Sequence, residues 1–299
     1  MYASNFVEGV DFSLYFILAI SVFFLVGITA VMIYFLFRYR KKRNPVATNI
    51  EGSWTLEIIW TVVPTILVLM MFWYGWVGYR PMLTAPDDAM EIQAVGQMWK
   101  WTFNYDNGKS SDTLVIPIDK PIKLNLVSKD VLHSLYIPAF RLKQDVVPGK
   151  DFSMWFIGQK LGRYDILCAE YCGQLHSYML SSVTVVENDE FDKWLAEEQD
   201  NSNEHPGLTL MKKNACFSCH TTDGSRLVGP SFKGVVGRSE TIIVDDKEET
   251  ITVDADFIKH KLQNPLSSNV KGFQSGLMPK LPLSDQEISH IIDYVSTIK

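Results

Sequence analysis

Two short cysteine motifs have the residue types of cofactor sites. The first runs Cys168-Ala-Glu-Tyr-Cys172-Gly-Gln-Leu-His176-Ser-Tyr-Met179. Two thiolates, an imidazole and a thioether in one loop form a soft ligand set, which selects copper, or zinc as its commonest rival. A disulfide between Cys168 and Cys172 would close so short a loop that it would stabilise the fold little. The motif therefore predicts a metal site, with a buried disulfide as the alternative.

A site for two metal ions needs one more nitrogen ligand from elsewhere in the fold. His133, in Asp130-Val-Leu-His133-Ser, is the candidate. Two thiolates that bridge two copper ions would give each copper one nitrogen, two sulfurs and one weak axial ligand. We therefore predict a two-copper site, and a structural zinc site stays open because Cys/His sites are so often zinc.

The second motif, Cys216-Phe-Ser-Cys219-His220, is the signature of c-type heme attachment. The two thiols add to the heme vinyl groups as thioethers, and His220 becomes an axial ligand of the iron. Met278 is the predicted second axial ligand, because His/Met ligation raises the potential into an electron-transfer range. His260 and His290 are its rivals, but both fall on predicted helices, where surface positions are expected.

Two uncharged stretches, Phe12 to Phe37 and Ile58 to Tyr79, are long enough to span a bilayer, which takes about 20 apolar residues in a helix. The second ends in aromatic residues that favour the headgroup level. It contains Pro64, which is tolerable near a helix start. The stretches predict a transmembrane hairpin, and two buried helices of a soluble protein are the alternative.

A cationic run from Arg38 to Arg43 lies between the two spans. Lysine and arginine in short loops mark the cytoplasmic side, so both termini are expected outside. We expect no cleavable signal peptide, because Met1 to Phe6 lacks a basic segment and a cleavage site. The predicted location is the bacterial inner membrane, with residues 80–299 on the periplasmic side. Heme attachment of this type also takes place outside the cytoplasm.

The sequence pattern of the external part, residues 80–299, changes twice along its length. Alternating segments such as Ile122-Lys-Leu-Asn-Leu126 and Leu180-Ser-Ser-Val-Thr-Val185 predict short strands of an all-β sandwich or barrel. An acidic stretch follows, with a helix expected from Glu190 to Glu198 and a flexible remainder. A short helix should then carry the Cys216 motif, and Ser284 with Glu287 forms a capping box for a final helix. The predicted divisions are a hairpin (1–80), a β domain (81–187), a linker (188–206) and a cytochrome-type domain (207–299).

The net charge of the chain argues against a nucleic-acid partner. The 299 residues have a net charge of −6 and the sequence pI is about 5.5, so a nucleic-acid partner is not expected, since such proteins carry a basic face.

Residues from about 10 to about 190 resemble subunit II of cytochrome c oxidase. The resemblance rests on the copper motif and on four further segments: Asp130-Val-Leu-His133-Ser, Phe140 to Gly149, Gly96-Gln-Met-Trp99-Lys-Trp101-Thr-Phe103 and Trp54 to Thr61. It implies a cupredoxin-like β-barrel behind a two-helix transmembrane hairpin, with an all-α cytochrome c domain fused at the C-terminus. The implied dicopper ligands are His133, Cys168, Cys172, His176, Met179 and the backbone carbonyl of Glu170.

The resemblance also implies roles for single residues. The Glu170 side chain would help to hold a magnesium ion shared with the catalytic subunit, a role that suits a carboxylate. Trp99 would be the aromatic contact that receives electrons, although packing in the barrel explains such an aromatic too. Glu57 would lie at the mouth of a proton pathway, although a carboxylate at a helix N-terminus is also favourable for its dipole. Gly229-Pro230 resembles the cytochrome c turn that supports the axial histidine.

The expected function is an electron relay in a terminal respiratory oxidase. Electrons would pass from a donor through heme c and the dicopper centre to catalytic subunit I, which reduces oxygen to water and translocates protons. The donor is a cytochrome c or a quinol-oxidising complex, and other oxidase subunits and the lipid bilayer are further partners.

A subunit of a copper-dependent nitric oxide reductase is the nearest alternative to this function. A membrane-tethered copper carrier is another, but it has no need of the Cys216 motif. Nitrous oxide reductase shares the copper motif but does not suit two transmembrane spans.

Overall fold

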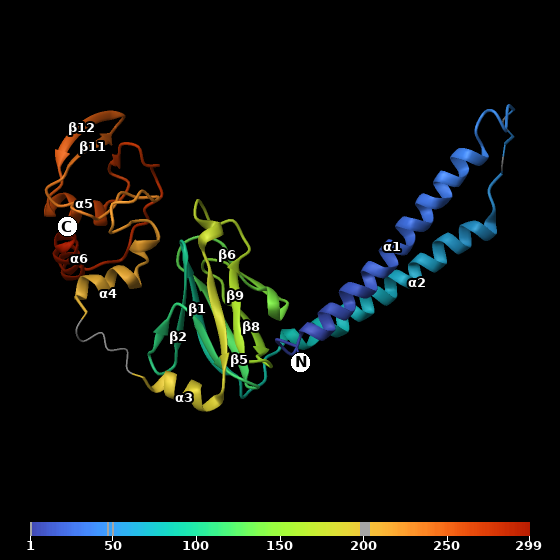
Figure 1. Cartoon of the computed structure of the whole chain (residues 1–299), viewed down its shortest axis with the longest axis horizontal. Coiled ribbons are helices and arrows are strands. Elements are labelled where there is room, and N and C mark those ends of the chain that lie inside the picture. Colours follow the sequence, from blue (N-terminus) through green and yellow to red (C-terminus); the bar gives the residue numbers. More distant parts are fainter. Residues whose placement is uncertain (1, 47, 50, 198–203) are drawn as a thin grey trace.

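The computed structural model describes residues 2–46, 48–49, 51–197 and 204–299. A helical hairpin projects from one side of a two-sheet β domain, and a mainly helical C-terminal domain lies on the other side (Figure 1). The sequence predicts these three parts, and the structure confirms them.

The hairpin consists of α1 (Val7–Arg38) and α2 (Trp54–Tyr79), followed by the short turn η1 (Arg80–Leu83). Both helices are long and apolar enough to cross a bilayer, and neither is buried inside the protein. They meet near the β domain, where Ser13 Oγ donates to the Tyr74 carbonyl at 3.4 Å. There Gly9 also lies against Gly78 without intervening side chains. The helices diverge toward the connecting loop (Figure 1).

Both helices begin earlier than the first uncharged residue of each stretch. The helix α1 starts at Val7, and Asp11 within it is paired with Arg141 of the β domain at 2.7 Å. A charge that finds a partner does not have to end the helix. Because α2 starts at Trp54, Pro64 lies in the helix interior, and the expectation that it lies near a helix start was wrong. Interior prolines are tolerated in membrane-spanning helices.

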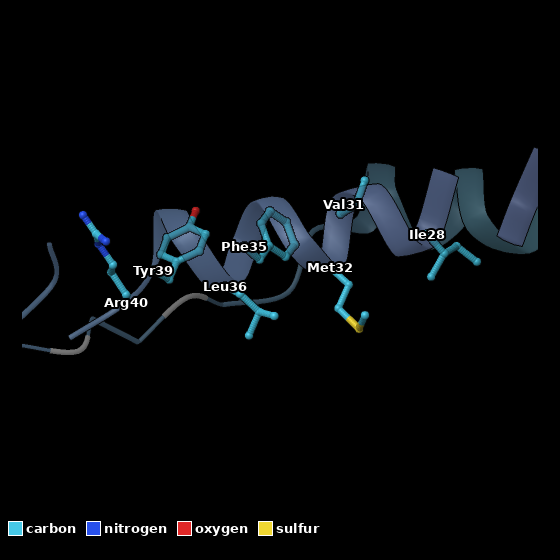
Figure 2. Close-up of a pocket in the computed structure, with 7 residues that line it drawn as sticks. All are labelled: Ile28, Val31, Met32, Phe35, Leu36, Tyr39 and Arg40. Atoms are coloured by element: carbon cyan, nitrogen blue, oxygen red, sulfur yellow. The ribbon is translucent and has the colours of Figure 1, made fainter. Parts of the chain in front are cut away.

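An apolar groove of about 570 Å³ follows the C-terminal part of α1 (Figure 2). Its lining is aliphatic and aromatic apart from one guanidinium at its end, and consists of Ile28, Val31, Met32, Phe35, Leu36, Tyr39 and Arg40. A contiguous apolar surface of this kind is typical of contact with a bilayer or a neighbouring subunit.

The β domain is a sandwich of two five-stranded sheets, in the orders β3-β2-β1-β5-β8 and β4-β10-β9-β6-β7. The pairs β1–β5 and β4–β10 are parallel and the others are antiparallel. Two short turns, η2 (Pro138–Phe140) and η3 (His176–Tyr178), interrupt the strands. The strands are β1 (Met90–Gln97), β2 (Lys100–Tyr105), β3 (Ser110–Ser111), β4 (Leu114–Pro117), β5 (Pro121–Ser128), β6 (His133–Ile137), β7 (Leu142–Val146), β8 (Phe152–Ile157), β9 (Gly162–Cys168) and β10 (Ser181–Val186).

Alternating side chains from both sheets fill the core of the sandwich. In β5, Ile122, Leu124 and Leu126 point inward while their neighbours are half-buried, as a half-buried strand requires. The strand expected from Leu180 to Val185 is β10, although Ser182 is buried there with Val183. Both predicted strands are confirmed.

The N-terminal segment ties the β domain to the membrane hairpin. The Asn5 N–H donates to the Ile157 carbonyl at 3.3 Å, and the Ile157 N–H donates to Asn5 Oδ1 at 2.8 Å. The ring of Phe6 packs edge-on against Trp155 with centroids 5.0 Å apart. Together with the ion pair between Asp11 and Arg141, these contacts fix the orientation of the sandwich on the hairpin.

The helix expected from Glu190 to Glu198 is α3 (Asn188–Ala196). Its Phe191 and Trp194 pack against Tyr105 of β2. The flexible stretch predicted after it falls mainly on residues 198–203, which lie outside the described residues.

The C-terminal domain contains α4 (Pro206–Lys213), η4 (Cys216–Ser218), α5 (Ala255–Gln263) and α6 (Asp285–Thr297). Helices α4 and α6 cross so closely that a Cβ on Gly207 would lie 2.0 Å from the His290 carbonyl oxygen. Glycine is therefore required at this crossing. The predicted capping box is present, since the Ser284 side chain accepts from the Glu287 N–H and the Glu287 carboxylate accepts from the Ser284 N–H.

Two features of this domain differ from the expectation. The helix α4 ends at Lys213, and Ala215 has a left-handed conformation (φ 56°), so the Cys216 motif lies on a separate turn rather than on the helix. The domain is helical but not all-α, because β11 (Ser239–Val244), β12 (Lys247–Thr252) and β13 (Asn269–Val270) form a three-stranded sheet.

Candidate functional site

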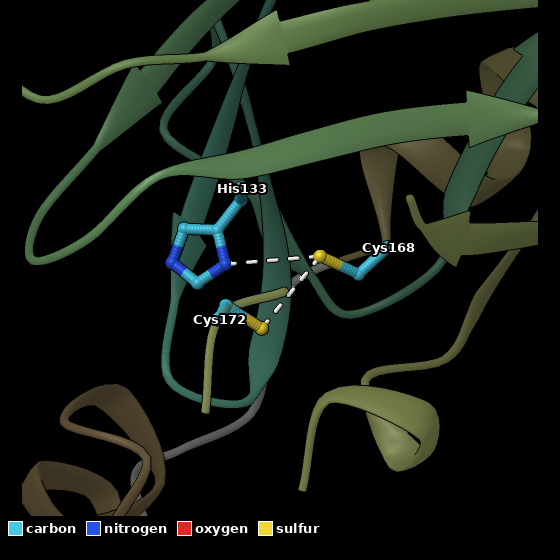
Figure 3. A group of neighbouring side chains, drawn as sticks. All are labelled: His133, Cys168 and Cys172. Carbon is cyan, nitrogen blue, oxygen red and sulfur yellow. Dashed lines mark hydrogen bonds between the residues drawn. The ribbon is translucent and has the colours of Figure 1, made fainter. Parts of the chain in front are cut away.

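Two thiols form the centre of the first site. The strand β9 ends at Cys168, and the loop after it returns so that the Sγ atoms of Cys168 and Cys172 lie 3.7 Å apart. His133, the first residue of β6, points at the same place, with Nδ1 3.9 Å from Cys168 Sγ (Figure 3). The His133 side chain is fully buried, and the two cysteines are nearly so. The sandwich therefore brings residues 35 positions apart into one cluster.

The orientation of His133 is set by Asp130, three residues earlier. The Asp130 carboxylate accepts the His133 Nε2–H at 2.7 Å and also accepts the N–H groups of Met98 and Val131. Burial alone would raise the pKa of Asp130, but these hydrogen bonds outweigh it and the pKa is lowered. With Nε2 holding a proton for Asp130, Nδ1 presents a lone pair toward the thiols, as a metal-binding histidine requires.

Three further donors surround the thiol pair. His176 Nδ1 lies 3.6 Å from Cys172 Sγ, and the thioether sulfur of Met179 lies 3.8 Å from the same atom. The Glu170 carbonyl lies 3.3 Å from Cys168 Sγ. The structure thus brings together every residue that the sequence singled out for this site.

The two thiols titrate as a pair. The Cys172 thiol donates to Cys168, which lowers the pKa of Cys168 to about 3 and raises that of Cys172. Burial opposes ionisation of both groups. One proton is therefore lost easily and the second reluctantly, and a bound cation would favour loss of both.

The donor set fits two copper ions. Each thiol has one imidazole nitrogen of its own, and each has one weak donor, the Met179 sulfur or the Glu170 carbonyl. Trigonal nitrogen and sulfur ligation with a weak axial donor is typical of copper. Four ligands complete a structural zinc site, so a single zinc would leave two of these six donors unused.

The Glu170 side chain points away from the thiols. Its Oε1 lies 3.5 Å from Lys143 Nζ, which also pairs with Asp145 at 2.7 Å. Both carboxylates are partly exposed, so this group of charges is accessible from outside the chain.

The second site is built around His220. Its Nδ1 donates to the Pro230 carbonyl at 2.7 Å, which directs Nε2 away from the supporting turn. A Cβ on Gly229 would lie 2.5 Å from the imidazole ring, so glycine is required where the turn passes the histidine. The imidazole ring also stacks on the Phe232 ring, with the two ring centroids 4.6 Å apart. Burial lowers the pKa of His220, despite the hydrogen bond to Pro230, and so favours the neutral form that binds iron.

The other heme-associated side chains are less tightly placed. Cys216 and Cys219 are half-buried free thiols, and burial raises the pKa of each to about 11. Met278 is half-buried and packs against the same hydrophobic cluster as Cys216. Of its rivals, His260 is exposed beside Ser267, and His290 lies on α6. A neutral imidazole held by one carbonyl beside two thiols fits attachment of a heme.

Trp99 lies between the two sites. Its indole N–H donates to the Cys172 carbonyl at 3.1 Å, and Gly173 passes its ring so closely that a Cβ would lie 3.1 Å away. Trp99 is 5% exposed and belongs to a hydrophobic cluster that also includes Val228 of the C-terminal domain, with Cys219 packed against it. The C-terminal domain therefore rests on the hydrophobic cluster that contains Trp99. Glu57 lies far from these sites, in the first turn of α2.

The sequence interpretation gave no role to Asp130 or Gly173. The spacing of Asp130 before His133 was a usable signal, because a histidine ligand needs an acceptor for its second nitrogen. No signal pointed to Gly173, since its close contact with Trp99 arises only in the folded chain.

Comparisons with known proteins cover most of the chain. Family models match the transmembrane domain of cytochrome c oxidase subunit II over residues 2–75 and its periplasmic domain over residues 109–186. The cytochrome c family model matches residues 205–299.

Curated relatives carry the same name. A "cytochrome c oxidase subunit 2" of Alkalihalophilus pseudofirmus is 28% identical and aligns over 95% of this chain and 86% of its own length. An "alternative cytochrome c oxidase subunit 2" of Bradyrhizobium diazoefficiens is 31% identical over 60% of this chain and 76% of its own. A crystal structure of the periplasmic domain of subunit II of the Bradyrhizobium japonicum cytochrome oxidase is 32% identical. It covers 38% of this chain and 94% of its own, with a TM-score of 0.36.

The fold and the two sites define a membrane-anchored metalloprotein with a cupredoxin-like domain and a cytochrome c domain. The chain belongs to the cytochrome c oxidase subunit II family. Membership implies copper and heme binding, association with subunit I and other oxidase subunits, and a part in an oxidoreductase. The names of the relatives favour the oxidase over the nitric oxide reductase and the copper carrier.

Proposed function

We propose that this chain carries electrons from an external donor to subunit I, in the order C-terminal domain, β domain, subunit I. Subunit I then reduces oxygen to water with proton translocation. The donor is a cytochrome c or a quinol-oxidising complex. When bound, one heme c and two copper ions supply the reversible one-electron chemistry.

The residues of this chain hold and orient those groups. Cys216 and Cys219 attach the heme, and His220 and Met278 ligate its iron, with Pro230 fixing the tautomer of His220. The copper ligands are His133, Cys168, Cys172, His176, Met179 and the Glu170 carbonyl. The exposed carboxylate of Glu170 is available for a magnesium ion shared with subunit I.

The observation that carries the relay order is the contact between the domains. The hydrophobic cluster that contains Trp99 extends to Val228, and Cys219 packs against it. Trp99 in turn donates to the backbone of Cys172 at 3.1 Å. The cluster against which Cys219 packs thus includes Trp99, whose indole N–H donates to the backbone of Cys172, and Trp99 is the proposed aromatic link between the two sites.

The proposed division of the chain is a hairpin (1–80), a dicopper domain (81–187), a linker (188–206) and a cytochrome c domain (207–299). In the bacterial inner membrane, the cationic loop after α1 faces the cytoplasm and both external domains face the periplasm.

Glu57, at the cytoplasmic start of α2, lies at a proton pathway entrance. Turnover of a Glu57→Gln oxidase should fall while reduction of heme c and copper stays normal. Unchanged turnover would mean that Glu57 only stabilises the N-terminal end of α2.

The relay is tested by changing Trp99 in the assembled oxidase. Trp99→Ala should slow electron transfer between heme c and the copper centre, measured by flash-induced absorbance changes, while both optical spectra stay intact. Trp73→Phe, on the exposed surface of α2, is the matched control and should leave the rate unchanged. An unaltered rate in Trp99→Ala would contradict the proposed route.

A further inference from the structure

A cleft of about 400 Å³ lies at the seam between the β domain and the C-terminal domain. We call it the seam cleft. Both domains contribute to its lining, which consists of Trp99, Lys100, Trp101, Asp112, Thr113, Arg163, Leu180, Ser181, Lys212, Ala215, Phe217 and Ser218.

The seam cleft is positively charged in a chain whose net charge is −6. Its charged lining residues are three cations, Lys100, Arg163 and Lys212, and one carboxylate, Asp112. Lys212 is paired with Glu204, whereas the described part of the chain places no carboxylate within ion-pair distance of Lys100 or Arg163. Arg163 donates through Nε to Ser182 at 2.8 Å, which leaves the other end of its guanidinium for a further acceptor.

Lys100 is the least satisfied of these cations. Burial lowers its pKa, Asp112 raises it in part, and repulsion from Lys212 lowers it further. Its Nζ reaches the Lys212 carbonyl across the seam at 3.4 Å, a long and weak hydrogen bond. A half-buried ammonium with one weak acceptor gains from an anion at hydrogen-bond distance.

Phe217 and Ser218, which lie between Cys216 and Cys219 in the sequence, also line the cleft.

We propose that the seam cleft binds a phosphate-class oxyanion, which bridges Lys100 and Arg163 of the β domain to the Lys212 and Ser218 region of the C-terminal domain. Arginine and lysine are the side chains that bind such anions, arginine through paired N–H donors. A ligand held from both domains stabilises their docked arrangement by its own binding free energy. The site is independent of the order in which electrons pass.

The test is equilibrium dialysis of radiolabelled inorganic phosphate against the purified, fully assembled oxidase at fixed ionic strength. One phosphate should bind saturably per chain, and Lys100→Gln or Arg163→Gln should weaken it about tenfold or more, as expected for loss of a charged hydrogen bond. Lys150→Gln, which removes an exposed lysine outside the cleft, should leave the affinity unchanged.

Copper and heme spectra of each variant show that the domains remain folded, and Lys100→Arg should retain binding. Absence of saturable binding would overturn the proposal. An equal loss of affinity in Lys150→Gln would overturn it as well, because binding would then follow overall charge rather than the cleft.

Discussion

The copper-type site and the heme-type site are organised in different ways. In the β domain, His133 and Met179 are fully buried, Cys168 and Cys172 are nearly so, and His176 is half-buried on η3. The described contacts around the thiols lie between 3.3 and 3.9 Å. In the C-terminal domain, His220 is the donor fixed by a short hydrogen bond. Cys216, Cys219 and Met278 are half-buried on turns and loops.

The difference follows from the size of each hydrophobic core. The cluster in the β domain includes buried side chains from both sheets, whereas the main cluster of the C-terminal domain is smaller. Its buried members are Met211, Leu262, Ile288, Ile291 and Val295. A core that small leaves a domain of this length marginal. We therefore expect the β domain to position its metal-ligating side chains by itself, and the C-terminal domain to need an attached heme to complete its interior.

Removing a copper ligand should empty the site without unfolding the β domain. In Cys172→Ser, one of the two shared sulfurs is lost, so we expect loss of both coppers and of the mixed-valence spectrum. Copper analysis and electron paramagnetic resonance measure this, with Ser177→Ala as the control in the same loop. A single colourless zinc ion in the unaltered protein would contradict the copper assignment, and a protease-sensitive β domain in the variant would contradict the preformed site.

Removing heme attachment should unfold the C-terminal domain, whereas loss of copper should leave the β domain folded. In Cys216→Ser with Cys219→Ser, the C-terminal domain should become protease-sensitive, since a main cluster of five buried side chains offsets only part of the conformational entropy of about 90 residues. Limited proteolysis should release it after residue 197 while the copper spectrum stays intact. A protease-resistant C-terminal domain without heme would show that both sites are preformed.

Asp130→Asn should weaken copper binding, with a smaller effect than loss of a cysteine ligand. The variant keeps the shape of the side chain but removes the charge that orients His133. Loss of such a partner typically weakens metal binding by about 10–100-fold. Competition with a copper chelator measures the affinity, and Asp151→Asn, on the exposed surface, is the control. Equal copper affinity in the two variants would mean that the sandwich alone orients His133.

The local parts of both sites were accessible from the sequence, because Cys168 to Met179 and Cys216 to His220 are contiguous motifs. The place of His133 in this site also followed, because a site for two metal ions needs a second nitrogen ligand in addition to His176. The hydrogen bond between His133 and Asp130 was not predicted, although the three-residue spacing between them was a usable signal. Packing of Trp99 in the barrel was one interpretation of the sequence, but its place in a cluster that also includes Val228, more than 100 residues later in the chain, was not predicted.

The fold was predictable where hydrophobic patterns are strong. Period-two alternation identified β5 and β10, and uncharged length identified both spanning helices. The hairpin of β11 and β12 was missed because β12 is exposed on nearly all of its length and has no inward-facing row. The helix α1 extends beyond the uncharged stretch and includes Asp11, which is paired with Arg141, a partner that no local pattern reveals.

The central claim, that electrons reach the β domain from the fused C-terminal domain, is tested most directly by stopped-flow reduction of the assembled oxidase. A tethered domain has an effective concentration in the millimolar range when its linker is short and flexible. Reduction should therefore proceed in the order heme c, copper, subunit I heme, with an interdomain rate independent of protein concentration. A chain truncated before Gly207 should keep its copper spectrum and depend on an added soluble cytochrome. If the truncated oxidase accepts electrons from its native donor as fast as the full-length one, the C-terminal domain is an accessory and the relay order is wrong.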